Sequence, residues 1–285
     1  MERFLTHFAN DEAHLSQSVL LELMTILGRY RNALYLVGGW APYFLLEQFQ
    51  KEDDPFDHIG SIDIDLVIDF TKISDAEYAG IVESLEKRGY PARKDRHGRV
   101  IPFSFARTIR GVTIAIDFLA GEYGGTEKSH RHQRVQNNLL ARKARGADLL
   151  PQHHLILQLD GYLPDGSHHH CDLRLGNIVS ILSMKGITIA ERYKEKDAYD
   201  IYALIVHYKK GANSCYEEIS PFCGNNLVKE GIQSICEKFS SEKAVGPAWA
   251  ATFMEPDNPS AAKVRQTKIY RQVIPFVKKM RGFLK

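Results

Sequence analysis

The sequence lacks the features that distinguish membrane, secreted, repeat and low-complexity proteins from ordinary globular proteins. Its 285 residues include four cysteines and two tryptophans. No apolar run approaches the roughly 20 residues that a membrane span requires. The first residues carry neither a basic stretch nor a long apolar one, so no secretory signal is predicted. Internal repeats and low-complexity segments are also missing. We therefore expect a cytoplasmic protein with no membrane partner.

Cysteine spacing and net charge say little about metal or nucleic-acid binding. The cysteines stand at Cys171, Cys215, Cys223 and Cys236. This spacing matches no metal site, so reduced thiols are expected. The net charge is only +2, which by itself indicates nothing about nucleic acid. Basic residues are concentrated in 93–110 and 131–145. Such runs are more often solvated faces, although they would suit an RNA backbone.

The pattern of apolar residues predicts an α+β fold with two parts. Helical spacing covers 11–31, 40–49 and 74–87, and strands are predicted at 34–37, 61–68, 99–107, 111–119, 153–162 and 169–174. Further helices are predicted at 177–192, 196–209, 225–239 and 258–283. We expect a small mixed sheet with helices on one face in residues 1–176. A helical domain in 177–285 would complete an active site.

Two short motifs together predict phosphate chemistry. An apolar strand ends in Gly38-Gly39 where a helix begins, and a second strand contains Asp63 and Asp65. Strand residues two apart project from one face, so the two carboxylates repel each other and lose solvation. A divalent cation resolves that conflict. Glycine alone could be a structural turn, and the acids alone could protect a sheet edge. Their combination favours a metal site.

A third carboxylate lies on another predicted strand. Asp117 is on the small, polar face of segment 111–119, as either a metal ligand or a surface acid. The run His168-His169-His170 also suggests a metal. Adjacent strand residues point to opposite faces, however, so these imidazoles cannot all bind one ion, and a solvated loop is the better interpretation.

The predicted helices contain a second group of charged residues. Lys185 interrupts an apolar helix, and Lys196 can pair with Asp200 one helical turn later. Asp197 or Asp200 could orient a lysine or a substrate hydroxyl, and a lysine is a natural phosphate partner. The alternative is an ordinary set of helix ion pairs.

These motifs carry a resemblance across residues 34–205. They are Gly38-Gly39, Ser61-x-Asp63-x-Asp65, the later Asp117, Met184-Lys185, and Lys196-Asp197-x-x-Asp200. The pattern resembles the nucleotidyltransferase superfamily (DNA polymerase β-like). More narrowly, it is similar to the AbiEii/AbiGii-type nucleotidyltransferase toxins, which include the MenT toxins.

The resemblance implies a nucleotidyltransferase-type mixed sheet and a role for each motif. Gly38, Gly39 and Ser61 would contact the triphosphate, as would Lys185 and Lys196. The implied metal ligands, for Mg²⁺ or Mn²⁺, are Asp63, Asp65 and Asp117. The implied catalytic residues are these three acids with Lys185, Asp197 and Asp200.

The resemblance also implies a substrate and partners. The enzyme would transfer an NMP from an NTP to RNA, with the tRNA 3′ end as acceptor. It would act as the toxin of a toxin–antitoxin or phage-defence system, with an antitoxin protein as partner. Two alternatives stay open. One is transfer to a small molecule of the antibiotic type or to a protein hydroxyl, and the other is a catalytically inactive nucleotide- or RNA-binding module.

Overall fold

The computed structural model describes residues 10–53, 55–73, 75–122, 132–136 and 139–284. Contacts along the chain divide it into two compact units. The sheet unit contains residues 10–40 and 61–176, and the helical unit contains residues 41–60 and 177–284. A single boundary at residue 176 does not capture this division, because residues 41–60 cluster with the helices that follow much later in the sequence.

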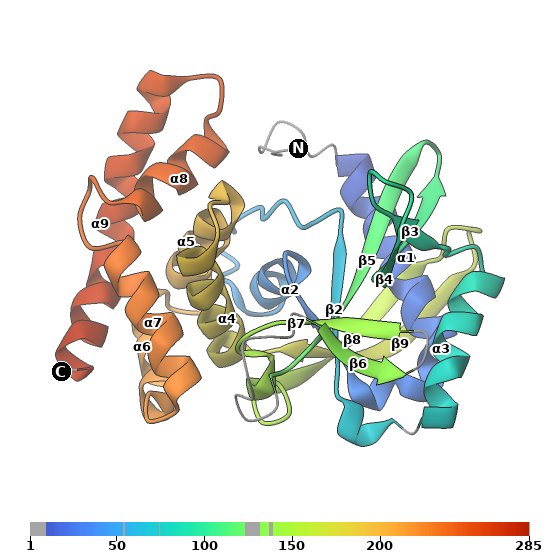
Figure 1. Ribbon diagram of the computed structural model, residues 1–285. Helices are drawn as coiled ribbons and strands as arrows, with labels where there is room; N and C mark the ends of the chain where they lie inside the picture. Colours follow the sequence, from blue (N-terminus) through green and yellow to red (C-terminus); the bar gives the residue numbers. More distant parts are fainter. Residues whose placement is uncertain (1–9, 54, 74, 123–131, 137–138, 285) are drawn as a thin grey trace. The chain divides into compact units, whose positions relative to one another are not determined.

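The sheet unit is built on one mixed β-sheet (Figure 1). Its strands are β1 (Leu34–Val37), β2 (Ile64–Ile68), β3 (Ala92–Lys94), β4 (Val100–Ile109), β5 (Val112–Ala120), β6 (His132–Gln136), β7 (Leu139–Lys143), β8 (His154–Tyr162) and β9 (His168–Gly176). The order is β3-β4-β5-β2-β1-β9-β8, and β7 pairs with β5 and β6. The pairs β1–β9, β2–β5 and β5–β7 are parallel, and the others are antiparallel.

Two helices of this unit pack on the strands. Helix α1 (Asn10–Ile26) contacts β5, β8 and β9, and α3 (Asp75–Lys87) lies beside β6. The apolar spacing that predicts α1 is the buried face of the helix: Val19, Leu20 and Leu23 have no exposed surface. The mixed sheet is confirmed. Its predicted small size is wrong, because β9 pairs with β1 and thereby adds the β8–β9 hairpin to the sheet.

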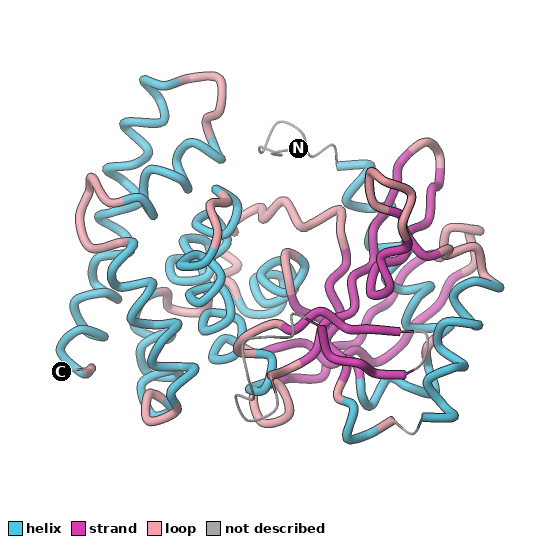
Figure 2. Tube along the Cα trace, in the orientation of Figure 1, coloured by secondary structure: helices cyan, strands magenta, loops and turns pink. Residues whose placement is uncertain are grey.

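In the helical unit, the helices from α4 to α9 follow one another through short connections, whereas α2 leads into a longer loop (Figure 2). They are α2 (Trp40–Phe49, in this unit from residue 41), α4 (Ile178–Glu191), α5 (Glu195–His207), α6 (Ala212–Ile219), α7 (Asn226–Lys238), α8 (Val245–Met254) and α9 (Pro259–Phe283). The sequence pattern misses α6 and α8. Helices α4 and α7 approach so closely that a Cβ on Gly186 would lie 2.0 Å from the carbonyl oxygen of Gly231. Within the described part of the chain, no helix has the length and apolar character needed to cross a membrane.

Candidate active site and a buried charge cluster

The glycine turn and the first acidic motif lie together in the sheet unit. Strand β1 ends at Val37, whose register partner on β2 is Asp65. The next residue, Gly38, has a φ of +68°, in the left-handed region that favours glycine. A Cβ at Gly38 would lie 2.1 Å from Oδ2 of Asp65. The backbone therefore approaches this carboxylate at a distance that only glycine permits.

Asp65 and Asp117 are neighbours across two parallel strands. They are register partners in the β2–β5 pair, so their Cα atoms are about one strand spacing apart and their side chains share a face. Asp63 lies in the bend before β2, which begins at Ile64 rather than at residue 61 as predicted. Asp63 is exposed, and Ser61 is half-buried. The structure thus brings Asp65 and Asp117 together and leaves Asp63 in the bend just before β2.

The donor set suits a magnesium ion that arrives with a substrate. Among the described residues, no group of three or more His, Cys, Asp or Glu side chains is arranged to hold a metal ion. Mg²⁺ in nucleotide sites is usually bound by one or two carboxylates, with substrate phosphates and water as its other ligands. The pair Asp65 and Asp117 offers hard oxygen donors of this kind. The residues present therefore fit the ion that the sequence motifs imply.

Two residues around Asp117 are not predicted from the sequence. Ser104 on β4 is the register partner of Asp117 and donates a hydrogen bond from Oγ to Oδ1 of that carboxylate. Arg93 on β3 donates from Nη1 to the same Ser104 Oγ at 3.1 Å, and its Nη1 lies 4.0 Å from Oδ1 of Asp117. Arg93 belongs to the basic run noted above. Only the β3–β4 and β4–β5 pairings bring Arg93 close to Ser104 and Asp117.

The second group of predicted residues forms a cluster inside the helical unit. The buried charge cluster comprises the buried residues His58, Lys185, Lys196, Asp197 and Asp200, together with Arg192, whose side chain is 47% exposed. Nζ of Lys185 donates to Oδ1 of Asp197 at 3.0 Å and to Oδ2 of Asp200 at 2.6 Å. Lys196 donates to Oδ1 of Asp200 at 2.8 Å, which confirms the predicted pair on α5. Arg192 holds Asp197 through two hydrogen bonds of 2.8 and 3.1 Å.

Burial and charge compete in this cluster. Burial alone would raise the pKa of Asp200, but Lys185 and Lys196 outweigh it and the net pKa falls. The pKa of Asp197 is lowered in the same way by Lys185 and Arg192, again against burial. Burial lowers the pKa of Lys185, but the two aspartates more than compensate and raise it. For Lys196 burial prevails over Asp200, so its pKa is lowered.

His58 completes the cluster and is absent from the sequence motifs. Its Nδ1 accepts a hydrogen bond from the backbone N–H of Gly60 at 3.1 Å, and its Nε2 lies 3.1 Å from Oδ1 of Asp200. An acceptor Nδ1 places the single proton of a neutral imidazole on Nε2, which therefore donates to Asp200. Burial lowers the pKa of His58 to about 4, with Asp200 opposing that shift. His58 is thus a neutral donor beside an ion pair.

Aromatic packing fixes the segment that carries His58. Phe56 stacks on His207 with ring centroids 4.2 Å apart, and the hydroxyl of Tyr199 accepts from the N–H of Ile59 at 3.3 Å. The segment is thereby held along α5. No periodic pattern in the sequence predicts where this segment lies. Its partners on α5 are about half the chain away in sequence.

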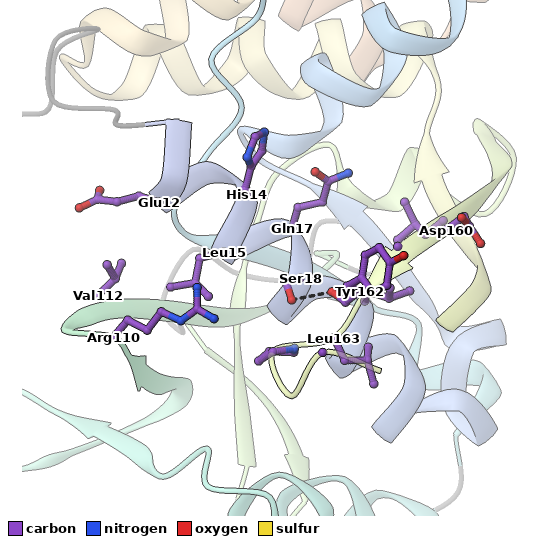
Figure 3. Close-up of a pocket in the computed structure, with 15 residues that line it drawn as sticks. Glu12, His14, Leu15, Gln17, Ser18, Arg110, Val112, Asp160, Tyr162 and Leu163 are labelled. Carbon is purple, nitrogen blue, oxygen red and sulfur yellow. Dashed lines mark hydrogen bonds between the residues drawn. The ribbon is translucent and has the colours of Figure 1, made fainter. Parts of the chain in front are cut away.

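A large groove lies elsewhere on the sheet unit (Figure 3). Its volume is about 820 Å³, and it is bounded by the start of α1, the β4–β5 turn at Arg110 and the β8–β9 hairpin near Tyr162. Ser18 on α1 donates to the carbonyl oxygen of Tyr162 across this groove. None of the predicted site residues lines it. No protein-family model matches this chain, and no curated protein matches it.

Proposed function

We propose that this protein is a nucleotidyltransferase that transfers an NMP from an NTP to RNA, with the tRNA 3′ end as acceptor. The observation that carries the proposal is the approach of Gly38 to Asp65, with Asp117 paired beside it. A tight glycine turn next to two carboxylates is an arrangement suited to a triphosphate and its metal ion. The mixed sheet is compatible with a nucleotidyltransferase-type fold. We propose this fold together with the activity.

The sheet unit would perform the chemical step. Asp65 and Asp117, with Asp63 nearby, would hold Mg²⁺ or Mn²⁺, which when bound neutralises charge that develops on the triphosphate. The backbone N–H groups of Gly38 and Gly39, at the start of a helix, meet the phosphates. Asp117 accepts the proton of the acceptor hydroxyl. The oxygen attacks the α-phosphorus, the bond to the β-phosphate breaks, and pyrophosphate leaves.

The buried charge cluster would give the helical unit a positively charged centre of its own. Lys185, Lys196 and Arg192 are three cations against the carboxylates of Asp197 and Asp200, and His58 is neutral, so the cluster carries a net positive charge. Such a charge favours the binding of an anion to the helical unit. The resemblance noted above further suggests a toxin with a cognate antitoxin, and this too belongs to the proposal.

The test is a transfer assay with matched variants. Purified protein is incubated with Mg²⁺, total RNA and each NTP in turn, radiolabelled at the α-phosphate. Asp65→Asn removes one charge from the carboxylate pair, and Asp172→Asn makes the same change at an exposed position on β9. We expect label in a tRNA-sized band with wild type and Asp172→Asn, and none with Asp65→Asn or with EDTA.

Other outcomes would replace parts of the proposal. Label on protein or on an added aminoglycoside, with RNA unlabelled, would keep the chemistry and change the acceptor. Equal labelling by wild type and Asp65→Asn would reject the assigned site. Complete absence of transfer, together with metal-independent nucleotide binding, would favour an inactive binding module.

A further inference from the structure

A strongly basic hairpin lies next to the proposed catalytic carboxylate. The basic hairpin is the segment 92–100 that joins β3 to β4; its basic residues are Arg93, Lys94, Arg96 and Arg99, and its one acid is Asp95. All four basic residues are exposed. β3 is also the terminal strand of the main sheet order, so the hairpin forms an edge of the sheet (Figure 1).

The single acid of this hairpin is already used by the turn. Oδ1 of Asp95 accepts from the N–H groups of His97 and Arg99 at 2.8 and 3.0 Å, and Oδ2 accepts from Nε of Arg99 at 2.8 Å. Asp95 therefore fixes the turn and neutralises Arg99. The charge left over belongs to Arg93, Lys94 and Arg96, which the turn holds within one short segment.

One of these cations extends toward the proposed site. Arg93 contacts Ser104 and lies 4.0 Å from Asp117, while its side chain is 42% exposed. A guanidinium that is both solvent-accessible and close to the catalytic carboxylate can bind a phosphate of the acceptor nucleotide. Nε of Arg96 donates to Nε2 of His97, so an exposed imidazole lies beside it. Imidazole rings and guanidinium planes can stack on unpaired bases.

We infer that the basic hairpin is the docking surface for the RNA acceptor, with Arg93 on the phosphate nearest the reacting hydroxyl. This inference rests on the proposed function. Lys94 and Arg96 bind upstream phosphates of the same single-stranded RNA. The RNA runs along the hairpin toward Asp117. A cationic small-molecule acceptor is disfavoured, because the excess positive charge of the hairpin repels it. An edge rich in Lys and Arg also resists pairing with another β-strand, which leaves it available to a polyanion.

The experiment separates docking from catalysis. Binding of a labelled single-stranded RNA is measured without NTP over a series of salt concentrations. The variant Lys94→Gln/Arg96→Gln removes two charges from the hairpin. The control Lys263→Gln/Lys268→Gln removes two exposed charges from α9. Circular dichroism and thermal melting verify that both variants fold.

We expect the hairpin variant to raise the Kd for RNA about tenfold and to reduce the slope of log K against log salt by about 1.4, because each single-strand phosphate contact contributes about 0.7. The KM for NTP should be unchanged, and the α9 control should match wild type. An unchanged Kd and slope in the hairpin variant, or an equal loss in the control, would overturn the inference. Wild type that binds RNA through the hairpin but transfers no label would refute the proposed function and leave the docking surface intact.

Discussion

The neutral state of His58 makes a quantitative prediction about pH. His58 is fully buried, and its pKa falls from 6.5 to about 4 on folding. A histidine whose folded pKa is lowered contributes stability above its unfolded pKa, and that stability is lost as the pH falls toward the folded pKa. The unfolded chain takes up a proton below about pH 6.5, whereas the folded chain excludes it until about pH 4.

The size of the effect follows from linkage. Between pH 7 and pH 5 the free energy of unfolding should fall by about 2 kcal/mol because of His58 alone, and the full loss near pH 4 should be about 3 kcal/mol. Protonation would also convert Nδ1 from an acceptor into a donor that opposes the N–H of Gly60, and it would place a further cation beside Lys185 and Lys196.

The assay is urea denaturation at both pH values for wild type and His58→Gln. Glutamine retains an N–H donor for Asp200 but does not titrate. We expect the variant to be less stable than wild type at pH 7, with a difference about 2 kcal/mol smaller at pH 5. His14→Gln makes the same change at an exposed position on α1 and should leave the stability at pH 7 as in wild type.

Two measurements could refute this reasoning. A stability difference between wild type and His58→Gln that is the same at pH 7 and pH 5 would mean that the imidazole is not held neutral. A nitrogen NMR spectrum with the proton on Nδ1 would contradict the hydrogen bond from Gly60 and hence the assigned tautomer.

The remaining predictions concern close approaches and buried charge. Gly38→Ala places a Cβ 2.1 Å from the Asp65 carboxylate at a positive φ, so we expect transfer activity to be lost, with a stability loss of about 1–3 kcal/mol in thermal melts. Gly186→Ala, whose Cβ would lie 2.0 Å from the Gly231 carbonyl oxygen, should separate α4 from α7 and lower the melting temperature. An unchanged melting temperature would contradict that packing. Asp200→Ala leaves two buried lysines without their shared carboxylate and should cost about 3–5 kcal/mol in denaturant titrations; a cost below 1 kcal/mol would show that the ion pairs are replaceable.

The parts of the fold that depend on local patterns could be predicted. The strand before Gly38, the hairpin of β4 and β5, and the helices with long apolar stripes agree with the spacing of their apolar residues. Short helix α6 and the apolar helix α8 have weak or ambiguous periodicity, so they are missed. The size of the sheet depends on the parallel pairing of Leu36 with Leu175, and no local pattern specifies a contact over that separation.

The candidate site, too, could be predicted only in part from the sequence. Residue types at a fixed spacing identify Asp65 and Asp117 separately, and the β2–β5 register makes them neighbours. Ser104 and Arg93 acquire their roles from the register of two further strands. The contact between His58 and Asp200 joins a loop to a helix 142 residues later. Only the folded chain shows that an isolated histidine belongs with the charged motif.

The two sets of acids differ in how firmly their partners hold them, and this difference separates their roles. Arg93 lies 4.0 Å from Asp117, and both side chains are partly exposed, so the pair contributes less than about 1 kcal/mol and is easily exchanged for another ligand. Lys185 lies 2.6 Å from Asp200, which has no exposed side-chain surface. Separating that buried pair would cost several times more. In the proposed function, Asp117 would therefore accept a metal ion and release Arg93 toward an acceptor phosphate, whereas Asp200 would position its lysines.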